Sequence, residues 1–365
     1  MGYQWGFEHE AFLHALLSPQ RQFTEMHLTK KILTFLCLLL AIPLFSANAS
    51  SPPVVVVSIP PLHSITAAVM EGRGEPQLIV SGNRSLHGFR LKPSQLRAIQ
   101  KADLLLYIDE DFENFLARAL KILPRSVDAF PLLSTSGLKL LPKRQGGLWE
   151  QHDHHHDEHE EEHEHGEHEG HDEHEEEHKY GEHERHDEHE DHNSSNIDWH
   201  VWLDVDNAKV LAKAIARELS RIDPDYRRLY LRNAKRWEKA MDQLDLEVKS
   251  RLMGMENRPF LVFHDAYQYF ENAYNLKALG SLTLEPNEQA SARQIQKIRR
   301  RLQLLGIVCI FSEPQFSDRL VTVVTENTNI KKGVLDPLGS VQSPGKSLYP
   351  KLIQAMAMEF ERALK

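Results

Sequence analysis

The sequence predicts an α/β protein of two similar lobes, each with a mostly parallel sheet flanked by helices, bridged by one long α-helix. Three observations predict this fold class. Continuous β-branched runs such as 54–59 are typical of buried parallel strands, and they alternate with helical segments. A stripe of apolar residues keeps helical spacing from Tyr230 to Val248. A strand, an acidic turn and a phenylalanine follow one another in both halves, at 106–112 and 309–316.

The first half of the chain alternates strands with helices. We expect strands at 54–59, 76–80 and 102–108, and helices at 62–70, 93–101 and 111–123. Pro60 and Pro61 end the first strand, and Pro93 suits the first turn of its helix because that position needs no amide hydrogen. This alternation predicts a lobe with a parallel sheet.

The long helix is predicted from Asp223 to about Leu252. Asp223 can cap it, with Pro224 in its first turn, and another helix spans 207–222. Its apolar stripe consists of Tyr230, Ala234, Trp237, Met241, Leu244 and Val248. About 29 residues of helix extend about 43 Å, which is enough to cross both lobes.

The second half repeats the alternation of the first. We expect strands at 259–263, 276–284, 308–311 and 333–335. Helices are expected from about 266 and at 290–305, 316–326 and 348–364. These elements predict a second α/β lobe over 255–365, after a first lobe over 50–222 and the bridging helix over 223–254.

The N-terminal residues 1–49 are interpreted as an extension followed by a cleaved secretory signal peptide. Lys30 and Lys31 precede an apolar run at 32–45, and the small residues at 46–49 form a cleavage site. A membrane anchor is the alternative, but a span needs about 20 apolar residues, and this run is shorter and contains Pro43. We interpret Met26 as the start of the signal peptide.

A histidine-rich acidic tract occupies 151–192. It contains 15 of the 22 histidines, 20 Asp or Glu residues and two basic residues. Because almost nothing in it is apolar, we expect it to be a disordered insertion in the first lobe. A solvated linker is the alternative, but imidazole and carboxylate groups in this density favour metal binding. The histidines are His152, His154, His155, His156, His159, His163, His165, His168, His171, His174, His178, His183, His186, His189 and His192.

Charge and cysteine content narrow the function classes. The formal charge is −10, and the tract carries 2 − 20 = −18, so the remainder sums to +8. No basic cluster with interleaved aromatic residues occurs, which argues against a nucleic-acid partner. Cys37 falls in the signal peptide, so Cys309 is expected to be a buried thiol without an intramolecular disulfide.

Four histidines remain outside the tract and the N-terminal extension: His63, His87, His200 and His264. Each falls at or near a strand end or a strand–helix junction, and open α/β sheets bind their ligands beyond the carboxyl ends of strands. A single histidine at such a place is more often a structural cap than a metal ligand. Four at equivalent positions, beside a histidine-rich tract, point to a metal site.

Five segments together resemble a known family. They are 85–94 (SLHGFRLKPS), 199–203 (WHVWL), 262–267 (VFHDAY), 311–316 (FSEPQF) and 335–339 (LDPLG). In this order and spacing they are similar to the metal-binding solute-binding proteins of ABC uptake systems, and to the zinc-specific branch in particular. The resemblance covers 52–365, and an acidic histidine-rich insertion is itself typical of the zinc branch.

The resemblance implies a periplasmic zinc carrier, expected to be a monomer, that binds Zn²⁺ between its lobes. It implies that the carrier delivers the ion to a membrane permease with a cytoplasmic ATPase. The family's ligand positions map onto His87, His200 and His264, and Asp336 stands where the family places a carboxylate. Either Asp336 or water completes the site, because Leu86 replaces a glutamate that some members use. Ala363 stands where many members have a cysteine that pairs with the equivalent of Cys309.

Neighbouring residues are expected to support the ligands. His63 is expected near the cleft, at a helix entry or as a partner of the ligands. Asp265 and Glu313 are candidates to accept the imidazole N–H that faces away from the metal. Metal binding requires neutral imidazoles, so the affinity should fall steeply below about pH 6.

Other functions are compatible with parts of this pattern. A manganese or nickel carrier of the same fold is one alternative, although three imidazoles favour Zn²⁺ over Mn²⁺. A three-histidine zinc hydrolase is another, but no motif offers a general base or nucleophile beside the histidines. We therefore expect a carrier and not an enzyme, with the tract as an auxiliary zinc collector or sensor.

Overall fold

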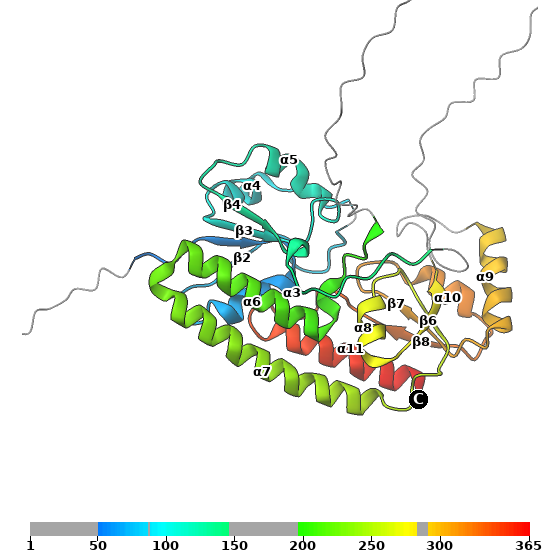
Figure 1. Cartoon of the computed structure of the whole chain (residues 1–365). Helices are drawn as coiled ribbons and strands as arrows, with labels where there is room; N and C mark the ends of the chain where they lie inside the picture. Colours follow the sequence, from blue (N-terminus) through cyan, green and yellow to red (C-terminus); the bar gives the residue numbers. More distant parts are fainter. Residues whose placement is uncertain (1–49, 87, 146–195, 283–290) are drawn as a thin grey trace, which may run out of the picture. The chain divides into compact units, whose positions relative to one another are not determined.

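The computed structural model describes residues 50–86, 88–145, 196–282 and 291–365 (Figure 1). The predicted signal peptide, the histidine-rich tract and His87 lie outside the described residues. Within the described ranges, no helix has both the length and the apolar character that crossing a bilayer requires.

The first lobe contains a sheet of four parallel strands in the order β2-β1-β3-β4. The strands are β1 (Val55–Val57), β2 (Gln77–Leu78), β3 (Leu104–Tyr107) and β4 (Asp128–Pro131). Val56 is paired with Leu105, and both are fully buried, as the β-branched and leucine-rich runs predict. The sequence analysis missed β4, because Asp and Pro at its ends are depleted in strands.

The helices of this lobe follow its strands. They are α3 (Pro60–Val69), α4 (Pro93–Gln100), the 3₁₀ turns η1 (Asn114–Leu116) and η2 (Leu132–Ser134), and α5 (Ala117–Lys121). The prediction of one helix over 111–123 was wrong. The buried Glu113 carboxylate instead accepts the backbone N–H groups of Ile108 and Asp109, at 2.7 and 3.0 Å. These bonds close a turn after β3, so the helix begins later.

The second lobe repeats this arrangement. Its strands are β5 (Phe260–Val262), β6 (Ala278–Ser281), β7 (Cys309–Ser312) and β8 (Lys331–Val334). They are parallel and ordered β6-β5-β7-β8, which is the same topology as in the first sheet. Its helices are α8 (Gln268–Tyr274), α9 (Ala292–Leu304), α10 (Arg319–Thr325) and α11 (Leu348–Leu364). The prediction of two similar α/β lobes is confirmed.

A long helix accompanies both lobes. The turn η4 (Val201–Leu203) leads into α6 (Val205–Ile222), and the turn η5 (Pro224–Tyr226) leads into α7 (Arg227–Leu252). With 26 residues, α7 extends about 39 Å. All six residues of the predicted apolar stripe are buried. Helices α6 and α7 run side by side as an antiparallel pair (Figure 1).

The cap predicted for this helix was wrong. The Asp223 carboxylate accepts from Arg73 Nε at 2.8 Å and from the Tyr230 hydroxyl at 2.6 Å, and it makes no capping bond. Both partners are buried with it, so Asp223 joins the start of α7 to the chain after α3. An ion pair in this setting competes successfully with a cap, because a buried carboxylate must be neutralised.

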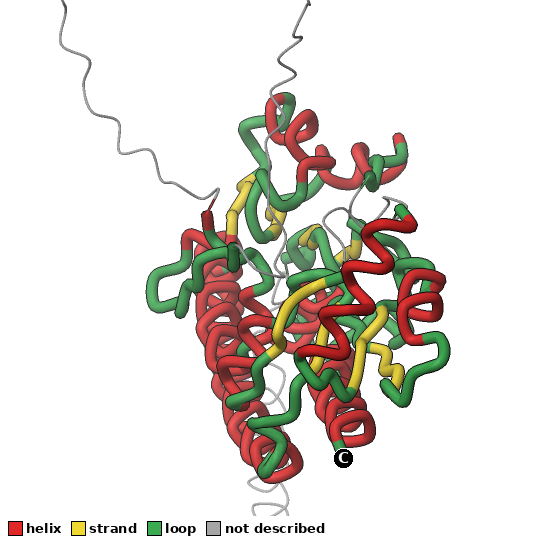
Figure 2. The backbone as a smooth tube through the Cα atoms, turned by 90° about the vertical axis from the view of Figure 1, so that its right-hand side faces the viewer, coloured by secondary structure: helices red, strands yellow, loops and turns green. Residues whose placement is uncertain are grey.

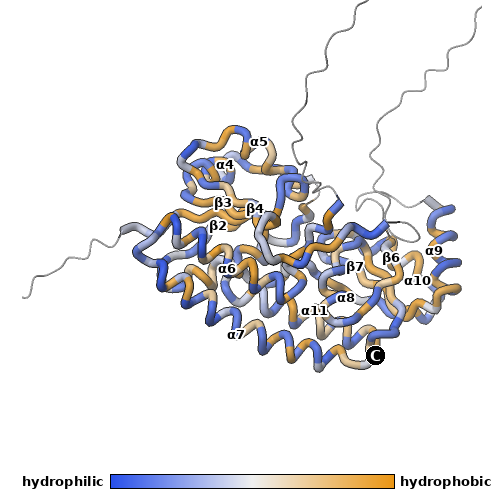
Figure 3. The backbone as a smooth tube through the Cα atoms, viewed as in Figure 1, coloured by the Kyte–Doolittle hydropathy of each residue, from blue (hydrophilic) through white to orange (hydrophobic). Residues whose placement is uncertain are grey.

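One apolar core is shared by the two sheets and the long helices. It contains residues of β1 and β5 together with the inner faces of α6, α7 and α11. Apolar residues are frequent in the strands, and polar and apolar residues alternate along α7 (Figure 3). Figure 2 shows the strands and the long helices from a second direction. Cys309 in β7 is fully buried as a free thiol, as predicted, and burial raises its pKa to about 12.

Candidate metal centre

A cavity of about 30 Å³ lies between the strand ends of the two lobes, large enough for a water molecule or an ion. His200 from the first lobe and His264 from the second both line it, with ring centroids 5.5 Å apart. The remaining lining residues are Ser85, Leu86, Phe112, Trp202, Glu313, Gln315, Phe316, Pro337 and Leu338. Two of the candidate ligands predicted from the sequence thus lie at one cavity.

His87 would be the third histidine, but it lies outside the described residues. Its neighbours Ser85 and Leu86 line the cavity. Among the residues that the structure describes, no group of three or more His, Cys, Asp or Glu side chains is gathered in a way that could hold a metal ion. The described centre therefore consists of two imidazoles and their supporting groups.

His200 is held by a carboxylate two residues before it. Asp198 Oδ1 accepts the backbone N–H of His200 at 3.0 Å and lies 2.8 Å from the ring Nδ1. Asp198 is 4% exposed, so this contact fixes the ring with little competition from water. Asp198 was not among the residues predicted from the sequence. The Asp-x-His spacing was its signal, because a short loop can fold an aspartate back onto the second residue after it.

His264 is held in the same way from a different strand. It lies in a bend directly after β5, and its Nδ1 is 2.5 Å from Glu313 Oε1, at the end of β7. Glu313 is 3% exposed. Strands β5 and β7 are neighbours in the parallel sheet, so their carboxyl ends bring these two side chains together. Glu313 is thus in contact with the imidazole that the sequence analysis named, and its role toward a metal stays a prediction.

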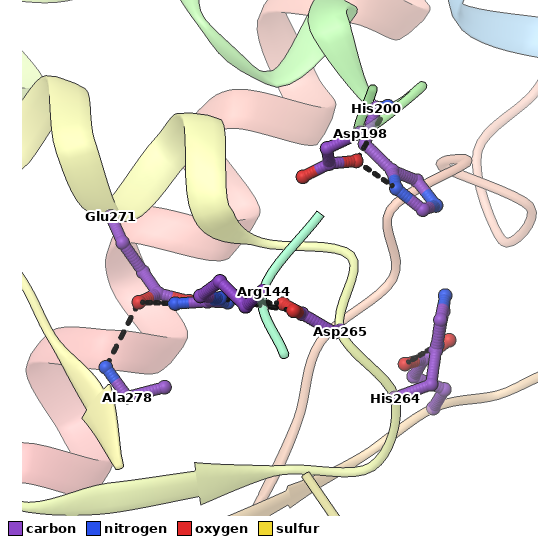
Figure 4. Close-up of polar contacts among 8 residues, drawn as sticks. Arg144, Asp198, His200, His264, Asp265, Glu271 and Ala278 are labelled. Atoms are coloured by element: carbon purple, nitrogen blue, oxygen red, sulfur yellow. Dashed lines mark hydrogen bonds and ion pairs between the residues drawn. The ribbon is translucent and has the colours of Figure 1, made fainter. Parts of the chain in front are cut away.

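Both contacts use Nδ1, so a metal bound by these rings would use Nε2. A carboxylate on the opposite nitrogen fixes the tautomer that presents the Nε2 lone pair and makes the imidazole a better donor. Figure 4 shows His200 with the Asp198 carboxylate beside its ring, and His264 on a separate loop. The chemistry of this donor set suits a borderline divalent cation.

Aromatic side chains surround the two imidazoles. Phe112 and Trp202 pack on His200 with centroid distances of 5.6 and 5.3 Å, and Phe316 packs on His264 at 5.9 Å. Phe112 and Phe316 are the phenylalanines that follow the two similar strand-and-turn segments of the sequence. The internal similarity therefore places one aromatic ring against a histidine in each lobe, and these rings limit the access of water to the site.

Asp336 does not line the cavity but contacts a residue that does. Its carboxylate accepts from Gln315 Nε2 at 2.7 Å and from the Ser340 hydroxyl at 2.9 Å. The backbone N–H groups of Leu338 and Val341 donate to it at 3.2 and 3.3 Å. A carboxylate with four donors can bind a metal once at least one of them moves away. Its assignment as a ligand stays a prediction.

Two other candidates have partners away from the cavity. His63 lies on α3, and its Nε2 is 3.0 Å from the carbonyl oxygen of Pro76. Burial lowers the pKa of His63, so its neutral form is favoured. Asp265 forms an ion pair with Arg144. Neither residue lines the cavity, so the structure gives them supporting contacts in the fold and no direct contact with it.

Comparison with known proteins identifies a family that this chain resembles over most of its length. A family model described as zinc-uptake complex component A, periplasmic (ZnuA) matches residues 55–363. The high-affinity zinc uptake system protein ZnuA of Brucella abortus is 45% identical over 310 residues, which cover 85% of this chain and 91% of the relative. That of Haemophilus influenzae is 34% identical over 346 residues, which cover 89% and 98%.

Solved structures share the fold. A crystal structure of ZnuA superposes with a TM-score of 0.64 at 21% identity and covers 86% of this chain and 100% of its own. The laminin-binding protein Lmb of Streptococcus agalactiae superposes with the same TM-score at 22% identity, with the same coverage. At these identities the superpositions establish the fold. With the family model matched over most of the sequence, the chain belongs to the ZnuA family of periplasmic zinc-uptake components.

Proposed function

We propose that this chain captures Zn²⁺ between its two lobes in the periplasm and delivers it to an ABC permease for high-affinity zinc import. The observation that carries the proposal is the pair of imidazoles, one from each lobe, that line one small cavity with Nδ1 held by a buried carboxylate. Membership of a zinc-uptake family supports zinc as the ion.

In the proposed site, His200 and His264 bind the ion through Nε2, and His87 provides the third imidazole. The cavity position of Ser85 and Leu86 supports His87, because these residues directly precede it. Either Asp336 or water is the fourth ligand. Three neutral imidazoles with a carboxylate or water form a normal tetrahedral zinc set.

This donor set favours zinc over the near alternatives. Manganese prefers more oxygen ligands, whereas His200 and His264 both offer imidazole nitrogens. The family consists of transport components and not of enzymes. Consistent with this, carboxylates contact Nδ1 of both rings and aromatic side chains pack on them, an arrangement that orients metal ligands.

Further features of the proposal concern the whole chain. A cleaved signal peptide within 1–49 exports it, and a permease with a cytoplasmic ATPase accepts the ion. The tract at 151–192 collects zinc or senses its supply, and raises its concentration near the cleft through a short tether. The carrier acts as a monomer. Because both sheets share one core with the long helices, local movement of the site loops releases the ion without a large closure of the lobes.

A zinc competition titration on protein purified without a histidine tag tests the proposal. The variant lacking 151–192 should bind one zinc ion tightly. His200→Ala and His264→Ala, introduced separately in that variant, should each abolish tight binding while the fold is retained by circular dichroism. Tight binding that survives in both variants would reject the site. A preference for Mn²⁺ over Zn²⁺ would reject the assigned ion.

A further inference from the structure

Arg144 makes a network of ion pairs directly beside the second histidine. Its Nε lies 3.0 Å from both carboxylate oxygens of Asp265, the residue after His264, and its Nη2 also donates to Asp265. Its Nη1 and Nη2 donate to the two oxygens of Glu271 on α8, at 2.8 and 3.0 Å. Figure 4 shows the guanidinium between these two carboxylates. One planar group thus joins the His264 bend to helix α8 through two forked contacts.

The network is buried and extends into the sheet. The side chains of Arg144, Asp265 and Glu271 are 16%, 14% and 4% exposed. Glu271 also accepts the backbone N–H of Ala278, the first residue of β6, at 2.9 Å. Burial opposes the charge of Arg144, but the contacts with Asp265 and Glu271 raise its pKa, so it stays charged. The bend that carries His264 is therefore fixed to α8 and β6 through a single cation.

Arg144 directly follows residues 141–143, which pair with the segment that carries Asp198, the partner of His200. An isolated antiparallel bridge pairs Pro142 with Ile197, and Asp198 donates its backbone N–H to Leu141 at 2.9 Å. The side chain of this same Asp198 holds the ring of His200. Only Lys143 lies between the bridged Pro142 and Arg144. The partner of one histidine and the anchor of the other therefore belong to one short two-stranded element.

Tyr269 on α8 ties this element to the second lobe. Its hydroxyl accepts the N–H of Leu141 at 3.0 Å and donates to the carbonyl of Asp198 at 2.8 Å. It is fully buried. Helix α8 thus contacts both strands of the bridge through Tyr269, and it contacts Arg144 through Glu271. This second connection limits how far the element can shift when Arg144 is changed, so a test on Arg144 can preserve the fold.

We propose that Arg144 is a positioning residue that fixes the His264–Asp265 bend relative to His200 and so sets the separation of the two imidazoles offered to the metal. This inference rests on the proposed function of the site. Zinc–nitrogen bonds are about 2.0–2.1 Å long, so a loosened bend would leave one imidazole out of reach for part of the time. Arg144 itself would not touch the ion.

The test measures zinc binding and coordination geometry in variants that lack residues 151–192, so that the cleft is the site observed. Arg144→Gln removes the charge and the forked contacts, and Arg144→Lys restores the charge alone. Asp265→Asn is a milder change, because Arg144 keeps its pair with Glu271. Arg73→Lys is the control, since Arg73 and Asp223 also form an ion pair with little exposure, and neither lines the cavity.

Three measurements are compared. Competition with a chelating dye gives the zinc dissociation constant, stopped-flow mixing with a chelator gives the zinc release rate, and visible absorption of the Co²⁺-loaded protein reports tetrahedral geometry. We expect Arg144→Gln to raise the dissociation constant about tenfold or more, through faster release, as for other groups that orient metal ligands. The Co²⁺ bands should weaken in the same variant. Asp265→Asn should show a smaller change of the same kind, and Arg144→Lys should recover part of it.

Arg73→Lys should lower the unfolding temperature and leave both the affinity and the Co²⁺ spectrum unchanged. A folded Arg144→Gln or Asp265→Asn variant with wild-type affinity, release rate and spectrum would overturn the positioning role. So would a loss that Arg73→Lys reproduces. If the parent protein itself lacks tight zinc binding, the proposed function fails instead, and the two failures are thereby distinguished.

Discussion

The imidazole rings of His200 and His264 come from different lobes, and their centroids lie 5.5 Å apart. Each ring presents Nδ1 to a buried carboxylate of its own lobe, Asp198 or Glu313. An ion that binds both rings joins the two lobes at this point. The carboxylates therefore control the geometry of a contact between lobes, although neither is expected to touch the ion.

Replacing these carboxylates by amides should weaken zinc binding without removing a ligand. Asp198→Asn and Glu313→Gln keep an oxygen that can accept the imidazole N–H but lose the charge that makes the ring a better donor. We expect the zinc dissociation constant from dye competition to rise about 10- to 100-fold in each. Asp242→Asn serves as control, because Asp242 is 56% exposed on α7 and neither it nor its partner Lys209 lines the cavity. Wild-type affinity in both amide variants would contradict the role of the carboxylates.

The fourth ligand can be identified from a pair of substitutions. If Asp336 binds zinc, Asp336→Asn should lower the affinity about tenfold, because the charged donor is lost. Ser340→Ala removes one donor that now holds this carboxylate, so it should leave the affinity unchanged or increase it. Equal, wild-type affinity in Asp336→Asn assigns the fourth position to water. The same dye competition measures both variants.

Stability should depend on pH through Glu113. Burial raises the pKa of this carboxyl to about 8, while in the unfolded chain it titrates near its ordinary value of about 4.3. Between these values the unfolded chain releases a proton that the folded chain keeps, so stability should fall as pH rises through this window and then level off. Urea unfolding of Glu113→Gln should show a smaller decrease than the wild type. The exposed Glu110→Gln should keep the wild-type decrease, and an identical pH profile for Glu113→Gln would refute the assignment.

Deletion of 151–192 should change the capacity for zinc and not the cleft. The formal charge becomes −10 + 18 = +8, and fifteen histidines are lost. Titration calorimetry should show that several weak binding events disappear while one tight event remains. If the tight event disappears with them, the tract and not the cleft holds the main site. A variant with the fifteen histidines replaced by serine separates the effect of imidazole from that of length.

Much of the fold follows from local patterns in the chain. Within the run at 54–59, Val55–Val57 became a buried strand because β-branched residues fit a parallel sheet covered on both faces. The stripe from Tyr230 to Val248 became the inner face of α7 because its period matches a helix. In both segments, the residue pattern that decides the structure lies within one short stretch of sequence.

The errors came from contacts distant in sequence or from buried charge. Asp223 does not cap α7 because Arg73, 150 residues earlier, takes its carboxylate. The helix expected from 111 begins later because Glu113 turns back to β3. In the candidate site, the strand ends located His200 and His264, but the pairing of Asp265 with Arg144 depends on a segment 121 residues away. Such pairings depend on the folded topology, which a single sequence reveals only in part.

The bridge between Pro142 and Ile197 has a consequence for the design of variants. Pro142 precedes the 146–195 segment and Ile197 follows it, so the chain is already paired on both sides of that segment. Lengthening the intervening chain then costs mainly closure entropy, about 0.6 kcal/mol for each doubling. A fluorescent domain inserted there would be attached through the element that carries Asp198 and Arg144, the partners of the two imidazole-bearing loops.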